Sequence, residues 1–158
     1  MSKKTSSAQR VQQALNQAGL STQVLELPAS TRTAEAAAEA VGCRVGQIVK
    51  SLVFSTDQSQ RPVLILTSGE NQVDESTAEQ VIGEKIRFAD PEFVRETTGF
   101  AIGGVSPVGH KQKVSTYIDR DLLQYSAIWA AAGTPHAVFE ITPDNLIRIT
   151  GGEVIRVS

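Results

Sequence analysis

The sequence predicts an α+β fold, with a mixed, barrel-like β-sheet of about seven strands and peripheral helices. Three observations indicate this class. Short runs of β-branched and apolar residues are interleaved with four or five short helical patterns. Strand and helix patterns do not alternate strictly along the chain. No segment of the sequence repeats. At 158 residues, the chain is also long enough to bury its own core. We therefore expect residues 1–158 to form a single domain.

The composition is that of a soluble globular protein, with 41% hydrophobic and 20% charged residues. A formal net charge of −2 argues against a strongly basic nucleic-acid binder, and DNA is not expected as a partner. Two pairs of residues remain as candidates for a local basic patch: Lys85 with Arg87, and Lys111 with Lys113.

Cys43 is the single cysteine, and the sequence has no Cys/His spacing typical of a zinc site. Neither a metal nor another cofactor is expected. The N-terminal segment MSKKTSSAQR lacks the apolar region of a secretion signal, and no apolar run approaches the ~18 residues of a membrane span. We therefore expect a cytoplasmic protein with no membrane partner.

The first part of the chain predicts two helices with a short strand between them. Each helix combines a polar capping residue, apolar or alanine residues at helical spacing, and a glycine that ends it. Pro28 ends the short apolar run that forms the strand. The expected elements are a helix from Ser6 or Ser7 to Ala18, a strand at 24–27, and a helix at 34–41 that Thr33 caps and Gly42 ends.

The clearest predicted strand is Ile48–Phe54, which is rich in β-branched residues and is followed by a polar segment. Together with a second apolar run at 62–67 it predicts a hairpin. Because alternate residues of a strand share a face, Lys50 lies on an apolar face whichever side of the sheet is buried. Its ammonium must therefore be paired, reach a cavity, or extend to water.

Two interpretations of Lys50 are open. Lysines commonly protect an edge strand from aggregation, or extend along apolar surface to reach water. Alternatively, Lys50 is a cation held at the floor of a pocket. Only the second interpretation makes Lys50 a functional residue.

The remaining predicted elements are shorter. Capping residues, prolines at the first helical position and terminal glycines mark the helices, while apolar alternation marks the strands. The apolar run Ser126–Ala131, which contains the only tryptophan, is not counted among the seven strands. The expected helices are 74–81, 90–98 and 142–147, with a single turn at 119–123, and the expected strands are 86–88, 114–118, 137–141 and 154–157.

The segment Phe100–His110, with the sequence FAIGGVSPVGH, is predicted to be a tight loop that exposes its backbone. Its glycines allow left-handed conformations and close approach, while its proline donates no N–H. A Walker loop, a dinucleotide fingerprint and a nucleophile elbow each require a different spacing of residues. The loop is therefore either a donor of backbone N–H groups to an oxygen-rich ligand or a wide turn between two strands.

His110 and His136 are the only side chains expected to titrate near neutral pH. His110 ends the glycine-rich loop and His136 follows a Gly-Thr-Pro turn, so each lies either at a pocket rim or in a surface or capping role. The spacing indicates no carboxylate pair and no Ser/His/Asp arrangement. The remaining candidates for a chemical role are Lys50 and the N–H groups of the loop. Fixed donors of this kind suit the stabilisation of an oxyanion and the orientation of water.

Three segments, in order along the chain, resemble the YbaK family of free-standing aminoacyl-tRNA deacylases, which is similar to the editing insertion of bacterial prolyl-tRNA synthetase. They are Val45–Leu52, Gly103–His110, and Ala132-Gly133 leading into Ile141–Leu146. The resemblance implies a mixed, barrel-like sheet with peripheral helices. It also implies hydrolysis, with water as the nucleophile, of the ester that joins a wrong, small amino acid to tRNA-Pro or a related tRNA.

The resemblance further implies which residues form the site. Lys50 occupies the position of the family's required lysine and is the expected catalytic residue. Gly103 and Pro107 match the ends of a G-x-x-x-P loop whose main chain binds the substrate, and Gly133 matches a glycine that helps wall the amino-acid pocket. The expected substrate-binding residues are Ser51, Gly103, Gly104, Val105, Ser106, Pro107, Gly109, His110, Gly133 and His136.

The expected partner is the aminoacylated acceptor end of tRNA. An aminoacyl-tRNA synthetase is a second candidate partner, because a slightly acidic chain suggests weak affinity for RNA. Ala131 stands where some family members have a serine, so the preferred amino acid stays open. Two other functions also stay open: a non-catalytic module that binds aminoacylated tRNA or nucleotide ends, and an esterase that acts on a small metabolite.

Overall fold

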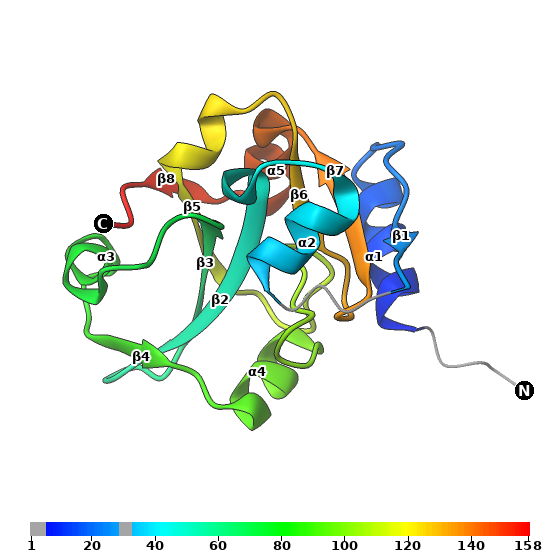
Figure 1. Ribbon diagram of the computed structural model, residues 1–158. Coiled ribbons are helices and arrows are strands. Elements are labelled where there is room, and N and C mark those ends of the chain that lie inside the picture. The colour runs from blue at the N-terminus through cyan, green and yellow to red at the C-terminus, as the bar shows by residue number, and fades with distance from the viewer. Residues whose placement is uncertain (1–5, 29–32) are drawn as a thin grey trace, which may run out of the picture.

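The computed structural model describes residues 6–28 and 33–158. Within these residues, one mixed sheet of eight strands has the order β1-β7-β6-β2-β3-β5-β8, and β4 pairs with β2 beside this path. Figure 1 shows the helices arranged around the sheet. The strands are β1 (Leu25–Glu26), β2 (Ile48–Thr56), β3 (Pro62–Ser68), β4 (Ile86–Phe88), β5 (Ser115–Asp119), β6 (Ile128–Ala131), β7 (Ala137–Ile141) and β8 (Glu153–Ile155).

The helices begin and end largely where the capping signals predict. Side chains of Ser6, Thr33, Asp90 and Thr142 accept hydrogen bonds from first-turn N–H groups, and four helices end at a glycine in the left-handed conformation. Among the described residues, no helix has the length and apolar character needed to span a membrane. The α-helices are α1 (Ser7–Gln17), α2 (Ala34–Val41), α3 (Glu75–Ile82), α4 (Pro91–Thr98) and α5 (Pro143–Thr150), with short 3-10 helices η1 (Val45–Gln47) and η2 (Arg120–Gln124).

The strand β2 occupies the centre of the sheet. One edge pairs with β3 in the antiparallel hairpin that the sequence predicts. The other edge is shared by two strands: β6 pairs with its start, at Ile48 and Val49, and β4 pairs with its end, from Phe54 to Thr56. Within the described chain, residues 50–53 therefore have no paired residue on that edge, although the carbonyl of Val53 accepts a hydrogen bond from the N–H of Ala89.

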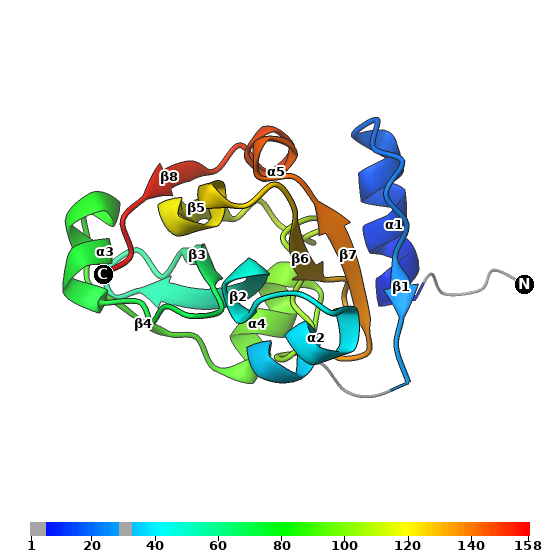
Figure 2. The same cartoon turned by 45° about the horizontal axis from the view of Figure 1, so that its top comes forward.

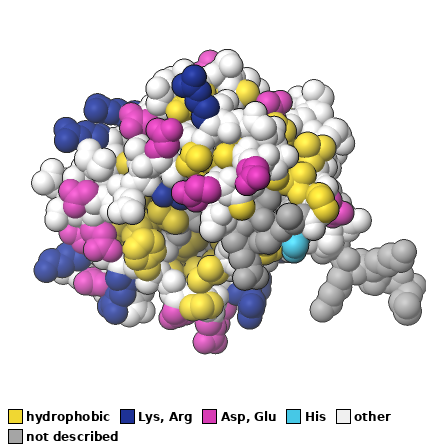
Figure 3. Space-filling model, viewed as in Figure 1, with side chains coloured by type: hydrophobic (Ala, Val, Ile, Leu, Met, Phe, Trp, Pro, Cys, Tyr) yellow, Lys and Arg dark blue, Asp and Glu magenta, His cyan; other side chains and the backbone are white. Residues whose placement is uncertain are grey.

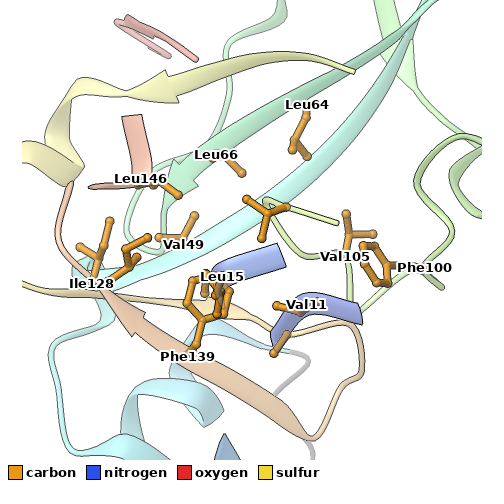
Figure 4. Packing of buried hydrophobic residues seen from close by; sticks show 14 of the residues in the cluster. Val11, Leu15, Val49, Leu64, Leu66, Phe100, Val105, Ile128, Phe139 and Leu146 are labelled. Carbon is orange, nitrogen blue, oxygen red and sulfur yellow. The ribbon is translucent and has the colours of Figure 1, made fainter. Parts of the chain in front are cut away.

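The main hydrophobic core lies on one face of this sheet. Val49 and Val53 of β2 contribute to it, together with residues of β3, β5, β6 and β7. Helix α1 closes the core from the side of β7, where Leu15 lies beside Phe139 (Figure 4). Figure 2 shows that β6 and β7 cross β2 and β3 at a steep angle, so the sheet bends around this core.

The opposite face of the sheet carries two smaller cores. Helix α2 packs its alanines against Ile48 near the start of β2, and α3 packs against Phe54 near its end. Lys50 lies between these two clusters and on the same face, because residues of even number in β2 share a side. The apolar face that the alternation predicts for Lys50 is therefore confirmed.

The α+β class and the mixed sheet are confirmed, with two differences in detail. The sheet has one strand more than the seven expected, because the run that contains Trp129 forms β6. This strand shows no polar alternation, since Ile128 and Ala130 lie in the main core while Trp129 packs against the α2 cluster. The second difference is that the described sheet is strongly bent but not closed, with β1 and β8 at its two ends.

Candidate functional site

A cavity of about 300 Å³ opens at the stretch of β2 that lacks a paired strand. Its walls include residues 48–53 of β2, Phe88 at the end of β4 with Ala89 after it, the loop that follows α4, and Ala131 of β6. On the face shown in Figure 3, hydrophobic side chains gather around a hollow between β2, β4 and α4. A cavity of this size and lining suits a small ligand that carries a few polar groups.

Lys50 is half-buried and supplies a cation to the wall of this cavity. Its Nζ donates a hydrogen bond to the main-chain oxygen of Asn71 at 2.5 Å. Burial lowers the pKa of the Lys50 ammonium below its usual value, and the carboxylates of Glu35 and Asp119 oppose this shift. Lys50 lies on the stretch of β2 between the β6 and β4 pairings, where the described chain provides no paired strand, and its side chain lines the cavity.

Asn71 is held in place by a buried carboxylate that the sequence does not single out. Asp119 is 1% exposed and accepts hydrogen bonds, each 2.9 Å long, from the Asn71 side chain and from the N–H of Ser68. Asp121 accepts a further bond from the Asn71 amide at 2.7 Å. The only sequence signal for this role is that Asp119 directly follows a predicted strand. The sequence does not indicate its partners, because Ser68 and Asn71 are far from it in the chain.

Ser51 follows Lys50 in the sequence but faces the other side of β2, together with Val49 and Val53. Its Oγ is buried and has no hydrogen-bond partner in the part of the chain that the structure describes. A buried hydroxyl without a partner is costly, so Oγ is suited to bind a ligand atom that enters the cavity.

The glycine-rich loop contributes backbone to the same cavity. Gly103 and Val105 line it, and Gly103 has a left-handed φ of 94° that a side chain would strain. Among the described residues, the N–H groups of Gly103, Val105 and Ser106 have no hydrogen-bond acceptor. The loop therefore has free backbone donors at the cavity that Lys50 also lines.

Close packing holds this loop in one position. A Cβ added at Gly104 would lie 2.7 Å from the Cα of Thr134, so the loop rests directly on the turn between β6 and β7. At the start of the loop, Arg10 of α1 donates to the oxygen of Gly99 at 2.6 Å and lies over the ring of Phe100. The donors of the loop are thus fixed by contacts outside the cavity.

The other predicted residues of the loop are not among those that line this cavity. Nε2 of His110 lies 2.6 Å from the oxygen of Ser106, and burial lowers the pKa of the imidazole below its usual value. His110 lines a different cavity, together with Pro107 and Gly109. This places His110 as a support for the loop, at a distance from the cavity that holds Lys50.

The predicted residues of the β6–β7 turn lie beside the loop. Gly133 packs so closely on α1 that an added Cβ would lie 2.8 Å from the oxygen of Ser7. His136 is exposed, and its main-chain N–H donates a hydrogen bond to the Thr134 hydroxyl at 3.2 Å.

Of the predicted residues, the structure brings Lys50, Ser51, Gly103 and Val105 to one cavity. In the described part of the chain, no group of three or more His, Cys, Asp or Glu residues could hold a metal ion.

A family model of the aminoacyl-tRNA editing domain matches residues 28–149. The chain belongs to this family. The protein YwhH of Bacillus subtilis, named as uncharacterized, is 34% identical over 83% of this chain and 83% of its own length. The Enterococcus faecalis protein EbsC, named "Putative Cys-tRNA(Pro)/Cys-tRNA(Cys) deacylase", is 30% identical over 80% of this chain and 77% of its own.

Solved structures and synthetases are also similar to this editing domain. A crystal structure described as "a putative trans-editing enzyme for prolyl tRNA synthetase" is 52% identical, covers 96% of each chain and has a TM-score of 0.91. A segment of the Proline--tRNA ligase of Limosilactobacillus fermentum is 31% identical over 57% of this chain, which corresponds to 16% of that ligase. This chain is therefore related both to free-standing editing proteins and to a part of prolyl-tRNA synthetases.

The electrostatic surroundings of Lys50 predict the direction of a pKa change. The Glu35 carboxylate raises the pKa of Lys50, so Glu35→Gln should lower that pKa further below its usual value. NMR titration of the Lys50 side chain in both proteins measures this change. Glu39→Gln, on the same exposed surface of α2, is the matched control and should leave the pKa of Lys50 unchanged. An unchanged or raised pKa in Glu35→Gln would contradict the assigned cause.

Proposed function

We propose that this protein is an aminoacyl-tRNA deacylase that hydrolyses the ester bond of mischarged tRNA, with residues 1–158 acting as a single editing domain. One observation carries the proposal. In a chain of the aminoacyl-tRNA editing family, a half-buried lysine, an unpartnered hydroxyl and free loop N–H groups all lie at one cavity. Fixed donors in such a cavity are suited to an ester whose carbonyl becomes an oxyanion.

In the proposed reaction, water attacks the carbonyl carbon of the ester. A new C–O bond forms and the carbonyl electrons move to the oxygen, where the Lys50 ammonium and the N–H groups of Gly103 and Val105 stabilise the negative charge. The ester C–O bond then breaks, and the ribose hydroxyl leaves with the proton lost by the water. Removal of one oxyanion donor typically costs about 100- to 1,000-fold in kcat.

The substrate that we propose carries a small amino acid on tRNA-Pro or a related tRNA. The name of EbsC supports a small amino acid, cysteine, and Ala131 adds no hydroxyl to the wall of the cavity. The names of EbsC and of the solved structure support tRNA-Pro as the carrier and prolyl-tRNA synthetase as a partner. For a protein that acts on such a substrate, we propose a cytoplasmic location.

The first test measures deacylation of tRNAs charged with alanine, serine, threonine, cysteine or proline. The wild type should hydrolyse one or two of them, and Lys50→Ala should lose at least about 100-fold in kcat because it removes the cation beside the carbonyl. Arg156→Ala is the matched control, since Arg156 is exposed and borders a different cavity. Circular dichroism of each variant checks that the fold is kept.

The same experiment separates the alternatives. Full activity in Lys50→Ala would remove the lysine from the mechanism. If the wild type binds these tRNAs and hydrolyses none, the protein is a binding module. Hydrolysis of small esters without any preference for aminoacyl-tRNA would instead indicate a metabolite esterase.

A second prediction concerns the backbone of the loop. Gly103→Val should reduce kcat, because a β-branched residue resists the left-handed φ of 94° and its side chain enters the cavity wall. Gly83→Val is a matched control, since Gly83 has a similar φ of 89° but ends α3 outside the cavity. Thermal unfolding should show similar destabilisation in both variants, while only Gly103→Val loses turnover. Equal kinetics in the two variants would exclude the loop from the site.

A third prediction concerns the unpartnered hydroxyl. Ser51→Ala should stabilise the fold slightly or leave its stability unchanged, because it removes a buried hydroxyl that has no partner, yet it should weaken substrate binding or turnover. Ser55→Ala is the control, since Ser55 shares the same face of β2 but lies outside the cavity wall. Steady-state kinetics and thermal unfolding measure the two effects. Unaltered kinetics in Ser51→Ala would show that the hydroxyl contacts no substrate atom.

A further inference from the structure

Two exposed apolar side chains lie at the mouth of the cavity. Phe88 is 62% exposed and Ile102 is 51% exposed, the highest values among the large hydrophobic residues of the described chain. Both line the cavity, although they come from different segments, the end of β4 and the glycine-rich loop. Large apolar side chains that stay exposed at the lining of one cavity indicate a binding surface.

The ring of Phe88 is held in a fixed place. Its centroid lies 4.5 Å from that of Phe54, with 31° between the ring planes, and Phe54 is fully buried. The two residues are also paired in the register of β2 and β4. Because the buried ring supports one side and the strand pairing fixes the backbone, Phe88 offers its exposed surface with little loss of side-chain freedom on binding.

The proposed reaction determines what lies at this mouth. The ester joins the amino acid to the ribose of the terminal nucleoside, so an ester carbonyl beside Lys50 and Gly103 leaves the ribose at the opening and its base outside. An aromatic ring stacks on the flat face of a base, and this contact needs no positive charge. A chain of net charge −2 attracts phosphates weakly overall, and base stacking supplies affinity that does not depend on this attraction.

We propose that Phe88 and Ile102 form a binding site for the terminal adenine of the tRNA acceptor end, with the base stacked on the Phe88 ring and Ile102 packed against it. This inference rests on the proposed function. It assigns the base to the rim of the cavity and the amino acid to its interior. The rim therefore recognises the nucleoside whichever amino acid is attached.

The test compares three esters of one amino acid: aminoacyl-tRNA, aminoacyl-adenosine and the ethyl ester, which has no base. Phe88→Ala should raise KM about 5- to 150-fold for the first two, the range that base–aromatic stacking supports, with a smaller effect on kcat. Phe88→Trp should keep the KM of the wild type, and the ethyl ester should not distinguish the variants. Ile102→Ala should raise KM in the same direction.

Val81→Ala is the matched control, because Val81 is 43% exposed and lies beside a different cavity. It should leave all three KM values unchanged. An equal loss on the ethyl ester in Phe88→Ala would mean that Phe88 only supports the cavity, and this would overturn the proposal. Unchanged KM values for aminoacyl-adenosine would overturn it as well.

Failure of the proposed function has a different signature. If the wild type hydrolyses none of the three esters, binding of an amide analogue, 3′-alanylamino-3′-deoxyadenosine, is measured by calorimetry. Binding that weakens in Phe88→Ala and persists in Phe88→Trp and Val81→Ala would support the rim site without catalysis. Equal binding by all of these proteins would overturn the rim site independently of any hydrolysis.

Discussion

The candidate site depends on the interrupted pairing of one edge of β2. A strand edge without a neighbour presents main-chain donors and acceptors that require partners. Here β6 and β4 pair with the two ends of β2 and leave residues 50–53 between them, so the gap becomes the wall of a cavity. Side chains from both faces of the strand reach this opening, which is why Lys50 and Ser51 can serve one site although they point in opposite directions.

Burial and nearby carboxylates have opposite effects on the pKa of Lys50. The position between the α2 and α3 clusters disfavours the ammonium, while Glu35 and Asp119 favour it. The hydrogen bond to Asn71 fixes the direction of the side chain, and Asp119 fixes Asn71 in turn. The Lys50 side chain is therefore directed by a main-chain oxygen, and among the described residues it forms no ion pair with a carboxylate.

The loop and the rim complement this cation in different ways. Gly103 and its neighbours offer fixed N–H groups whose position is set by packing on α1 and on the β6–β7 turn. Phe88 and Ile102 offer apolar surface at the opening. Polar donors inside and apolar surface outside match a molecule with a reactive ester at one end and a flat base beyond it.

The sequence alone determined the local structure, because capping residues, terminal glycines and strand alternation act over a few neighbouring positions. It also indicated Lys50 and the loop at 100–110, since a cation on an apolar strand face and a glycine-rich segment are unusual in themselves. Only the tertiary structure decided that Asp119 and Asn71 support Lys50, that His110 supports the loop, and that Phe88 stands at the cavity mouth. Those contacts join residues far apart in the chain, and their partners depend on the order of strands in the sheet, which no local pattern records.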